Sequence, residues 1–61
     1  MIEDLYPGDI FEYDSVVYFV TRSWTAKPYF VSERQGYTED EMEAILKEKP
    51  KMIRHDGKWC F

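Results

Sequence analysis

Apolar and polar residues alternate along three short stretches of this chain, residues 9–13, 16–22 and 29–33. A period of two places successive side chains on opposite faces of a strand, so each stretch predicts a β-strand. Five tyrosines, four phenylalanines and two tryptophans supply many of the apolar positions. Because aromatic side chains bury the most area per residue, the pattern is typical of a very small β-structure built around rings.

Two turn signals bound the first two strands. The sequence Tyr-Pro-Gly-Asp at residues 6–9 has proline second and glycine third, as a type II turn requires. The Asp-Ser pair at residues 14–15 is short enough to join the strands as a two-residue hairpin loop. We therefore expect the first strand at about residues 9–13 and the second at about residues 16–22.

The number of residues in that loop sets the register of the first hairpin, and the register determines on which face of the sheet each side chain lies. With two loop residues, Tyr13 lies opposite Val16, and facing pairs share one side of the sheet. The face that we assign to the core carries no charge except Asp9 at its end. It consists of Phe11, Tyr13, Val16, Tyr18 and Val20. The second face is more apolar than solvent exposure requires, and it consists of Ile10, Glu12, Val17, Phe19 and Thr21. An odd number of loop residues would exchange the two faces.

The middle of the chain predicts a loop followed by a third strand. Residues 23–28 indicate a loop that exposes the ring of Trp24, and residues 29–33 indicate the strand. A Trp24 ring that folds back onto the sheet is the alternative. Residues 35–37 then break the strand ahead of a helix.

Residues 38–50 carry a helix start, an apolar face and a helix stop. Thr38 and Glu41 have the spacing of a capping box, in which each side chain accepts a hydrogen bond from the backbone N–H of the other residue. Apolar residues recur three and four positions apart at Met42, Ile45 and Leu46, so this side of the helix should pack on the sheet. Because Pro50 cannot continue a helix, we expect the helix at about residues 39–48.

Residues 51–55 and 58–61 predict the last two strands, joined by Asp56 and Gly57 in a favoured type I′ hairpin turn. Sixty-one residues make a single domain, and its element order is β-β-β-α-β-β. The fold class that this order predicts is α+β and mostly β, a small five-stranded antiparallel barrel. Both an SH3-like and an OB-like barrel fit the order.

The Pro-Gly-Asp turn at residues 7–9 and the aromatic hairpin after it resemble the first hairpin of SH3-like small β-barrel proteins of bacteria and bacteriophages. The resemblance covers residues 6–22, about a quarter of the chain. It implies a small barrel that is used for binding. No functional residue is carried over from it, because one fold serves many functions.

Composition narrows the classes of function. The net charge of −4 disfavours a primary role in binding nucleic acid, whose phosphates need an excess of Lys and Arg. The first 43 residues carry ten acidic and three basic side chains, whereas the remaining 18 carry two acidic and five basic. The acidic part is expected either to be a solvated surface or to bind a basic patch on a partner.

The chain lacks the signals of a membrane or secreted protein. No stretch approaches the roughly 18 consecutive apolar residues of a membrane span, and the amino terminus has no signal-peptide pattern. Cys60 is the only cysteine, so no intramolecular disulfide forms and a reducing compartment is favoured. We therefore expect a soluble, cytoplasmic protein. One Cys and one His cannot form a four-ligand zinc site.

Two groups of polar residues have structural explanations. His55 and Cys60 flank the last turn, but the register places Cys60 opposite Ile53, and no motif supplies an orienting group or an oxyanion site. We expect a surface His55 and a small buried Cys60. Helix capping and the helix dipole explain the carboxylates at residues 39–43, since a calcium loop would need a glycine at its bend. The sequence thus predicts no catalytic residue, metal site or cofactor, and the protein is not expected to be an enzyme.

Exposed rings beside cations favour binding to another protein. Trp, Tyr and Arg are enriched at interface hot spots, and a loop Trp24 next to Arg22 and Lys27 would leave apolar area in water. With the second face of the first hairpin, the predicted partner-binding residues are Ile10, Glu12, Val17, Phe19, Arg22, Trp24 and Lys27. The predicted function is a small acidic protein-binding module, an inhibitor or modulator such as a bacteriophage host-takeover or anti-defence protein.

Two alternatives stay open. A nucleic-acid-binding module of the OB-like or SH3-like type would use nearby cations for phosphates and would stack bases on Trp24, Tyr29, Phe30 and Tyr37. A homo-oligomer would instead hold a small signalling molecule in its pockets. Chains of this size often gain stability from a partner, which fits binding to another protein and self-association alike.

Overall fold

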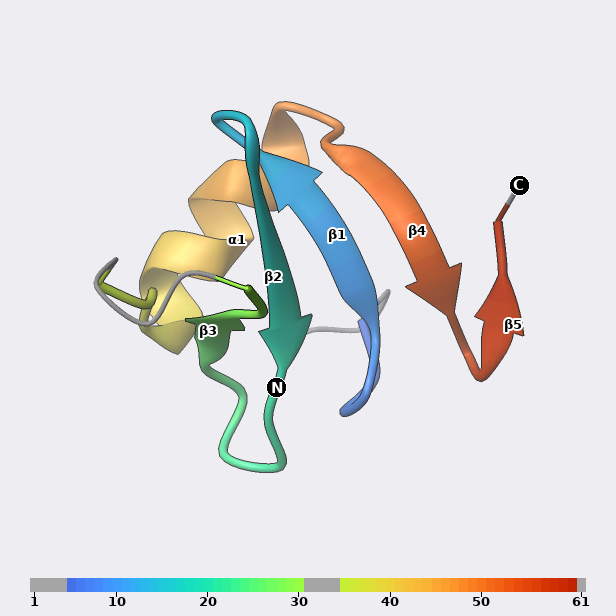
Figure 1. Ribbon diagram of the computed structural model, residues 1–61. Coiled ribbons are helices and arrows are strands. Elements are labelled where there is room, and N and C mark those ends of the chain that lie inside the picture. Colours follow the sequence, from blue (N-terminus) through green and yellow to red (C-terminus); the bar gives the residue numbers. More distant parts are fainter. Residues whose placement is uncertain (1–4, 31–34, 61) are drawn as a thin grey trace.

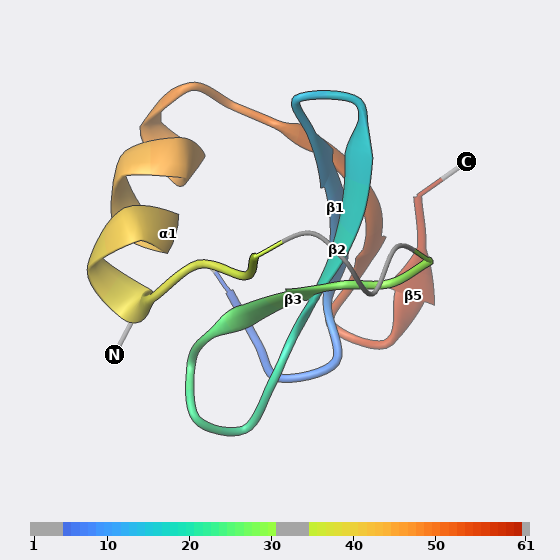
Figure 2. The same ribbon diagram turned by 60° about the vertical axis from the view of Figure 1, so that its left-hand side comes forward.

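Five antiparallel strands and one helix follow one another in the predicted order. The computed structural model describes residues 5–30 and 35–60. The elements are β1 (Ile10–Tyr13), β2 (Val16–Val20), β3 (Ala26–Pro28), α1 (Glu39–Lys47), β4 (Lys51–His55) and β5 (Lys58–Trp59). The strands form one sheet in the order β3-β2-β1-β4-β5, and α1 packs on one face of it (Figures 1 and 2). The prediction of a mostly β, α+β chain is confirmed.

The first hairpin has the predicted register. Tyr13 pairs with Val16 across the hairpin. Asp14 and Ser15 have φ values of 52° and 63°, and two left-handed residues in a two-residue loop are typical of a type I′ turn. This turn matches the right-handed twist of the strands, so the even loop length fixes which face each side chain takes.

The turn at the start of β1 is also confirmed. The Asp9 N–H donates to the Tyr6 carbonyl over 3.0 Å, and Gly8 has a φ of 96°, which a residue with a Cβ rarely adopts. The Gly8 N–H donates to the Val20 carbonyl, and the Val20 N–H donates to the Asp9 carbonyl. Two residues thus oppose one, which makes a β-bulge with Gly8 at its left-handed position.

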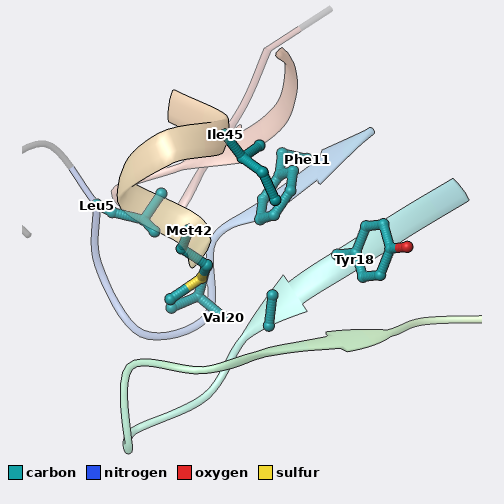
Figure 3. Close-up of a cluster of buried hydrophobic side chains, with 7 residues drawn as sticks. Leu5, Phe11, Tyr18, Val20, Met42 and Ile45 are labelled. Atoms are coloured by element: carbon teal, nitrogen blue, oxygen red, sulfur yellow. The ribbon is translucent and has the colours of Figure 1, made fainter. Parts of the chain in front are cut away.

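The core lies between α1 and one face of the sheet, which we call the core face (Figure 3). Its buried members are Leu5, Phe11, Tyr18, Val20, Ala26, Met42 and Ile45. The rings of Phe11 and Tyr18 stack with centroids 5.6 Å apart. Tyr13 and Val16 pack at the margin of this cluster. The predicted core face is therefore confirmed.

The helix begins with the predicted capping box. The Glu41 N–H donates to the Thr38 hydroxyl, and the Thr38 N–H donates to the Glu41 carboxylate over 2.9 Å. The predicted end at residue 48 is accurate, because Glu48 is the C-cap. The Tyr13 hydroxyl donates to the Glu48 carboxylate over 2.8 Å, and this bond raises the pKa of Tyr13 above its ordinary value. No helix in residues 5–30 and 35–60 has the length and apolar content to cross a membrane.

The predicted barrel is wrong, because the sheet is open. Its two edge strands, β3 and β5, have only three and two residues and do not pair with each other. A barrel requires its first and last strands to meet along a hydrogen-bonded seam. The coarser prediction of five antiparallel strands holds, while the closure does not.

The predicted third strand is displaced along the chain. Strand β3 is Ala26–Pro28, in the segment that the pattern indicated as a loop, and residues 31–33 lie outside the described residues. Pro28 is compatible with this strand because a residue on an edge strand can do without an N–H donor. The Tyr29 N–H still donates to the Val17 carbonyl over 2.7 Å. Ala26 forms an isolated bridge with Tyr37 on the other side.

The last hairpin has the predicted turn but a shorter strand. Asp56 and Gly57 have φ values of 52° and 76°, as a type I′ turn requires. Strand β5 ends at Trp59 instead of residue 61, and residue 61 lies outside the described residues. The Cys60 N–H still donates to the Ile53 carbonyl, so the expected pairing of these two residues is confirmed.

Candidate functional site: the open face of the sheet

The face of the sheet opposite α1 is covered by no helix in the described part of the chain (Figure 2), and we call it the open face. Strand register places two rows of side chains across it. The first row runs Lys27, Phe19, Ile10, Arg54 and Trp59. The second row runs Tyr29, Val17, Glu12 and Lys51. Apolar side chains thus occupy the middle of the open face, with cations toward both sides.

A bulge in β4 adds one more apolar side chain to this face. Ile10 pairs with Arg54 while Phe11 pairs with Met52, so the register shifts and Ile53 is the extra residue. Met52 packs at the margin of the core, whereas Ile53 lines the open face. Bulges re-aim side chains in this way, and here the bulge turns Ile53 and Arg54 to the same side.

The open face contains an apolar hollow of about 370 Å³. It is lined by Ile10, Val17, Tyr29, Phe30, Ile53 and Trp59. The aliphatic side chains form the floor, and rings from opposite edges of the sheet form the walls. The wall residues Phe30 and Trp59 are 77% and 57% exposed. The hollow is large enough to take an apolar side chain of a partner. Among the described residues no side chain fills it, so its apolar lining is in contact with water.

The walls are held by ring contacts. Tyr29 packs edge-on against Phe19, with centroids 5.9 Å apart, and edge-on against Phe30, with centroids 4.8 Å apart. Across the hollow, the guanidinium carbon of Arg54 lies 5.3 Å from the centre of the Trp59 ring, a cation–π distance. Both walls are therefore positioned before any ligand arrives, which lowers the entropy cost of binding.

Charge is distributed unequally between the two sides of the molecule. The first turn of α1 carries Glu39, Asp40 and Glu41, on the far side of the sheet from the hollow. The two rows of the open face carry three cations, Lys27, Lys51 and Arg54, against the single carboxylate of Glu12. Although the whole chain is acidic, its apolar hollow lies in a locally basic surface.

Five of the seven predicted partner-binding residues share the open face. Ile10 and Val17 line the hollow, and Phe19 supports Tyr29 beside it. Register places Glu12 and Lys27 on the same face. Arg22 and Trp24 do not join them. Arg22 is exposed at the tip of the turn between β2 and β3.

The prediction of an exposed Trp24 is wrong. Its ring is half-buried and packs at the margin of the core, as the folded-back alternative proposed. The turn that carries it is short, because the Thr21 N–H donates to the Thr25 carbonyl and the Trp24 N–H to the Thr21 carbonyl. The two threonine hydroxyls lie 2.7 Å apart and close the same turn. This tight turn directs the ring back onto the sheet.

Four residues of the hollow lie outside the predicted partner-binding set: Tyr29, Phe30, Ile53 and Trp59. The nucleic-acid alternative named Tyr29 and Phe30 as base-stacking rings, whereas Ile53 and Trp59 were missed altogether. A signal existed for Trp59, because the Asp56-Gly57 turn fixes the hairpin register and places Trp59 opposite Arg54. The bulge that exposes Ile53 had no signal of its own. Tyr29 and Phe30 were assigned to a strand, and instead they leave the end of β3 and reach over the open face.

A buried carboxylate ties the two ends of the described chain together on the side of β4. Asp9 is 1% exposed, and its Oδ2 accepts from the Tyr6 N–H over 3.0 Å and lies 2.8 Å from His55 Nδ1. Its Oδ1 accepts from the Asp56 N–H over 3.0 Å. We call this set of bonds the Asp9 clasp. It fixes the β4–β5 hairpin, and with it Trp59, relative to the first hairpin.

The remaining polar groups of interest do not form a reactive site. His55 is engaged with Asp9, so the expected surface histidine is half-buried, and Cys60 is exposed where a buried thiol was expected. Cys60 follows the edge strand β5, where no further strand among the described residues covers it. A second hollow of about 310 Å³ is lined by Leu46, Lys49, Pro50, Met52 and His55. Among residues 5–30 and 35–60, no three His, Cys, Asp or Glu side chains gather to hold a metal ion.

In the part of the chain that the structure describes, the hollow of the open face is the one with aromatic walls, and the Asp9 clasp supports it. The resemblance of residues 6–22 to the first hairpin of SH3-like barrels is tested by no related sequence or structure and stays a prediction. Comparison of the chain with models of protein families, with curated proteins and with solved structures finds no match.

Proposed function

We propose that this chain is a protein-binding module and that the open face is its docking surface. The observation that carries the proposal is the hollow, in which the exposed rings of Phe30 and Trp59 stand on either side of an aliphatic floor. Aromatic anchors around a small apolar depression are typical of the centre of a protein interface. A partner side chain that fills the hollow would remove this apolar area from water.

The shape of the surface favours a protein over a nucleic acid. Successive bases stack best on rings that lie parallel to one another, whereas Tyr29 meets Phe19 at 89° and Phe30 at 70°, so these rings form no flat stacking platform. The floor is aliphatic and offers no ring to a base. Three cations on the open face and a net charge of −4 give the many phosphates of a nucleic-acid strand little counter-charge, although they can serve one or two carboxylates.

As an inhibitor or modulator, the module would act by covering a functional surface of its partner. This role fits a small chain whose distinguishing feature is one apolar docking surface, and bacteriophage host-takeover and anti-defence proteins work in this manner. The kinship of the sheet is part of the same proposal: the SH3-like alternative rests on the hairpin at residues 6–22, and the OB-like alternative rests on the element order. Such domains bind their ligands on exposed sheet surfaces and loops.

The experiment that tests the proposal compares the wild-type chain with a Phe30→Ala/Trp59→Ala variant in affinity capture from bacterial lysates. Both side chains are more than half exposed, so the variant should fold, which circular dichroism checks. A Lys47→Ala variant, changed on α1 away from the open face, is the control. We expect a stoichiometric protein that the wild type and the control retain and the double variant loses. Equal capture by all three proteins would place the docking surface elsewhere.

A further inference from the structure

We propose that the open face is built for an acidic protein segment, one that places an apolar side chain in the hollow and carboxylates beside it. The inference rests on the proposed protein-binding function and adds the chemistry of the partner. It also reverses the expectation from composition, since an acidic chain is expected to meet basic partners.

The first row of the open face brackets its apolar centre with two cations. Lys27 stands on β3 at one side of Phe19, and Arg54 stands on β4 at the other side of Ile10. Each pairing brings side chains about 5 Å apart at their Cβ atoms, so a segment that lies along this row would meet a cation on each side of its anchor.

Both cations retain capacity for a carboxylate. Lys27 is exposed, and no carboxylate among the described residues pairs with it. The guanidinium carbon of Arg54 lies 5.3 Å from the centre of the Trp59 ring, and a cation–π contact of this kind uses none of the five N–H donors of an arginine. An arginine edge can bind a carboxylate through two parallel hydrogen bonds, and such charge-assisted bonds are stronger than neutral ones.

The second row also carries a cation, Lys51, but its charge is offset by a carboxylate in the same row. Lys51 lies opposite Glu12, so these two charges offset each other at one end of the row. The rows together therefore present a surplus of positive charge around the hollow. The acids of α1 lie beyond the sheet and the core, and charges separated by more than about 8 Å are screened at physiological salt. A partner carboxylate at contact distance is therefore attracted by the cations of the open face more strongly than it is repelled by the acids of α1.

A second copy of this chain fits the surface less well. A symmetric dimer through the open face would bring Lys27, Lys51 and Arg54 toward the same cations of the other copy, which costs free energy. The acidic face of α1 is an alternative complement, but its apolar side chains Met42 and Ile45 are buried in the core. It therefore has carboxylates without an anchor for the hollow.

The test selects binders from a library of random displayed peptides on the folded wild-type protein. We expect the enriched peptides to contain a large apolar residue with Asp or Glu near it, and to lose binding to Trp59→Ala. Their affinity should fall about tenfold in a Lys27→Glu/Lys51→Glu variant, because Lys27 changes from an attraction to a repulsion and the loss of Lys51 leaves the charge of Glu12 without an offset. It should be unchanged in Lys47→Glu/Lys58→Glu, which has the same net charge but changes α1 and the side of β5 that His55 shares.

The other outcomes separate the two proposals. Enriched peptides that are neutral or basic, and that still depend on Trp59, would overturn the acidic segment while keeping the docking surface. Peptides that bind Trp59→Ala as well as wild type would overturn the docking surface itself. An absence of enriched peptides would overturn both proposals. In that case, salt-dependent binding of oligothymidine would assign the face to nucleic acid, and a concentration-dependent dimer lost in Trp59→Ala would assign it to a second copy.

Discussion

The core face and the open face of the sheet come from the same alternating strands, and they differ in what covers them. On the core face, Phe11 is 1% exposed beneath α1. On the open face, Phe30 is 77% exposed beside a hollow whose floor is already apolar. The one helix of residues 5–30 and 35–60 covers only the core face, so the rings of Phe30 and Trp59 at the open face stay largely in water.

The comparison of the two faces shows when an apolar face of a sheet needs an explanation beyond stability. Solvent exposure of one phenylalanine is ordinary, whereas a preformed hollow with aromatic walls on two sides is not. The core face is explained by stability alone, because its residues are buried by the chain's own helix. The open face has no such explanation within the described residues, and its rings are positioned as they would be for a ligand. The two faces should therefore respond differently to the same substitution.

The largest expected effect comes from making the same substitution on both faces. Phe11→Ala should destabilise the fold by about 3–5 kcal/mol, since it removes a buried ring and leaves a cavity. A domain of this size has a total stability of only about 3–9 kcal/mol, so this variant should be largely unfolded or close to it. Phe30→Ala should change the free energy of unfolding by less than about 0.5 kcal/mol. Urea unfolding followed by circular dichroism measures both values.

Partner or peptide binding should show the opposite order. Phe30→Ala should weaken binding while the fold remains intact, because the ring belongs to the wall of the hollow. If Phe30→Ala instead lowered stability as much as Phe11→Ala, the open face would be a second core and the division of roles would fail.

The core face could be predicted from sequence because local signals fix it. The turns at residues 14–15 and 56–57 contain residues that accept the required left-handed conformation, and the capping box of Thr38 and Glu41 fixes the helix start. Period-two alternation then assigns every side chain of the first hairpin to a face. These features act over a few residues, so they can be recognised without knowing the rest of the fold.

The open face could be predicted only in part because long-range contacts complete it. Ile53 reaches it through a bulge that exists only when β4 pairs with β1. Trp24 leaves it because the Thr21–Thr25 turn folds the ring back, a preference that its neighbours in sequence do not signal. The sequence pattern predicts a loop at Pro28. The structure places Pro28 in the edge strand β3, where no further strand needs its missing N–H donor. Edge strands are short and weakly specified, and both walls of the hollow are attached to them.

Breaking the Asp9 clasp should have an effect of intermediate size on the free energy of unfolding, and it should affect both faces of the sheet. Asp9→Asn should destabilise the fold by about 1–3 kcal/mol, because an amide nitrogen replaces one acceptor oxygen and leaves a buried donor without a partner. Since the clasp fixes the β4–β5 hairpin, the same variant should also perturb the NMR signal of the Trp59 indole. Urea unfolding and a two-dimensional amide spectrum provide the two readouts.

Asp40→Asn is the matched control for the clasp. Asp40 is exposed in the first turn of α1, where loss of its charge should cost about 0.5 kcal/mol through the helix dipole. An Asp9→Asn variant no less stable than this control would show that the clasp does not hold the hairpin. A destabilised Asp9→Asn variant with an unchanged Trp59 signal would show that the wall of the hollow is positioned by Arg54 alone.

The smallest expected effect concerns how the helix is held over the core face. The Tyr13 hydroxyl donates to the Glu48 carboxylate at the C-cap of α1, and this bond raises the pKa of Tyr13 above 10.0 in the folded state. A group whose pKa is raised by folding contributes stability that is present below the unfolded pKa and is lost as the pH rises through the folded value. The difference in melting temperature between wild type and Tyr13→Phe should therefore be constant near neutral pH and should shrink at pH values above about 10.

Glu48→Gln is the control for that titration, because it keeps a hydrogen-bond acceptor but removes the charge. In this variant the pKa of Tyr13 should move back toward its ordinary value, which ring-proton NMR can follow for this one tyrosine. A stability difference that persists unchanged into strongly alkaline solution would mean that the bond does not contribute, and that α1 is held over the core face by apolar contacts of Met42, Ile45 and Leu46. No helix in residues 5–30 and 35–60 lies over the open face. The pH dependence would therefore report on the covered side of the sheet only.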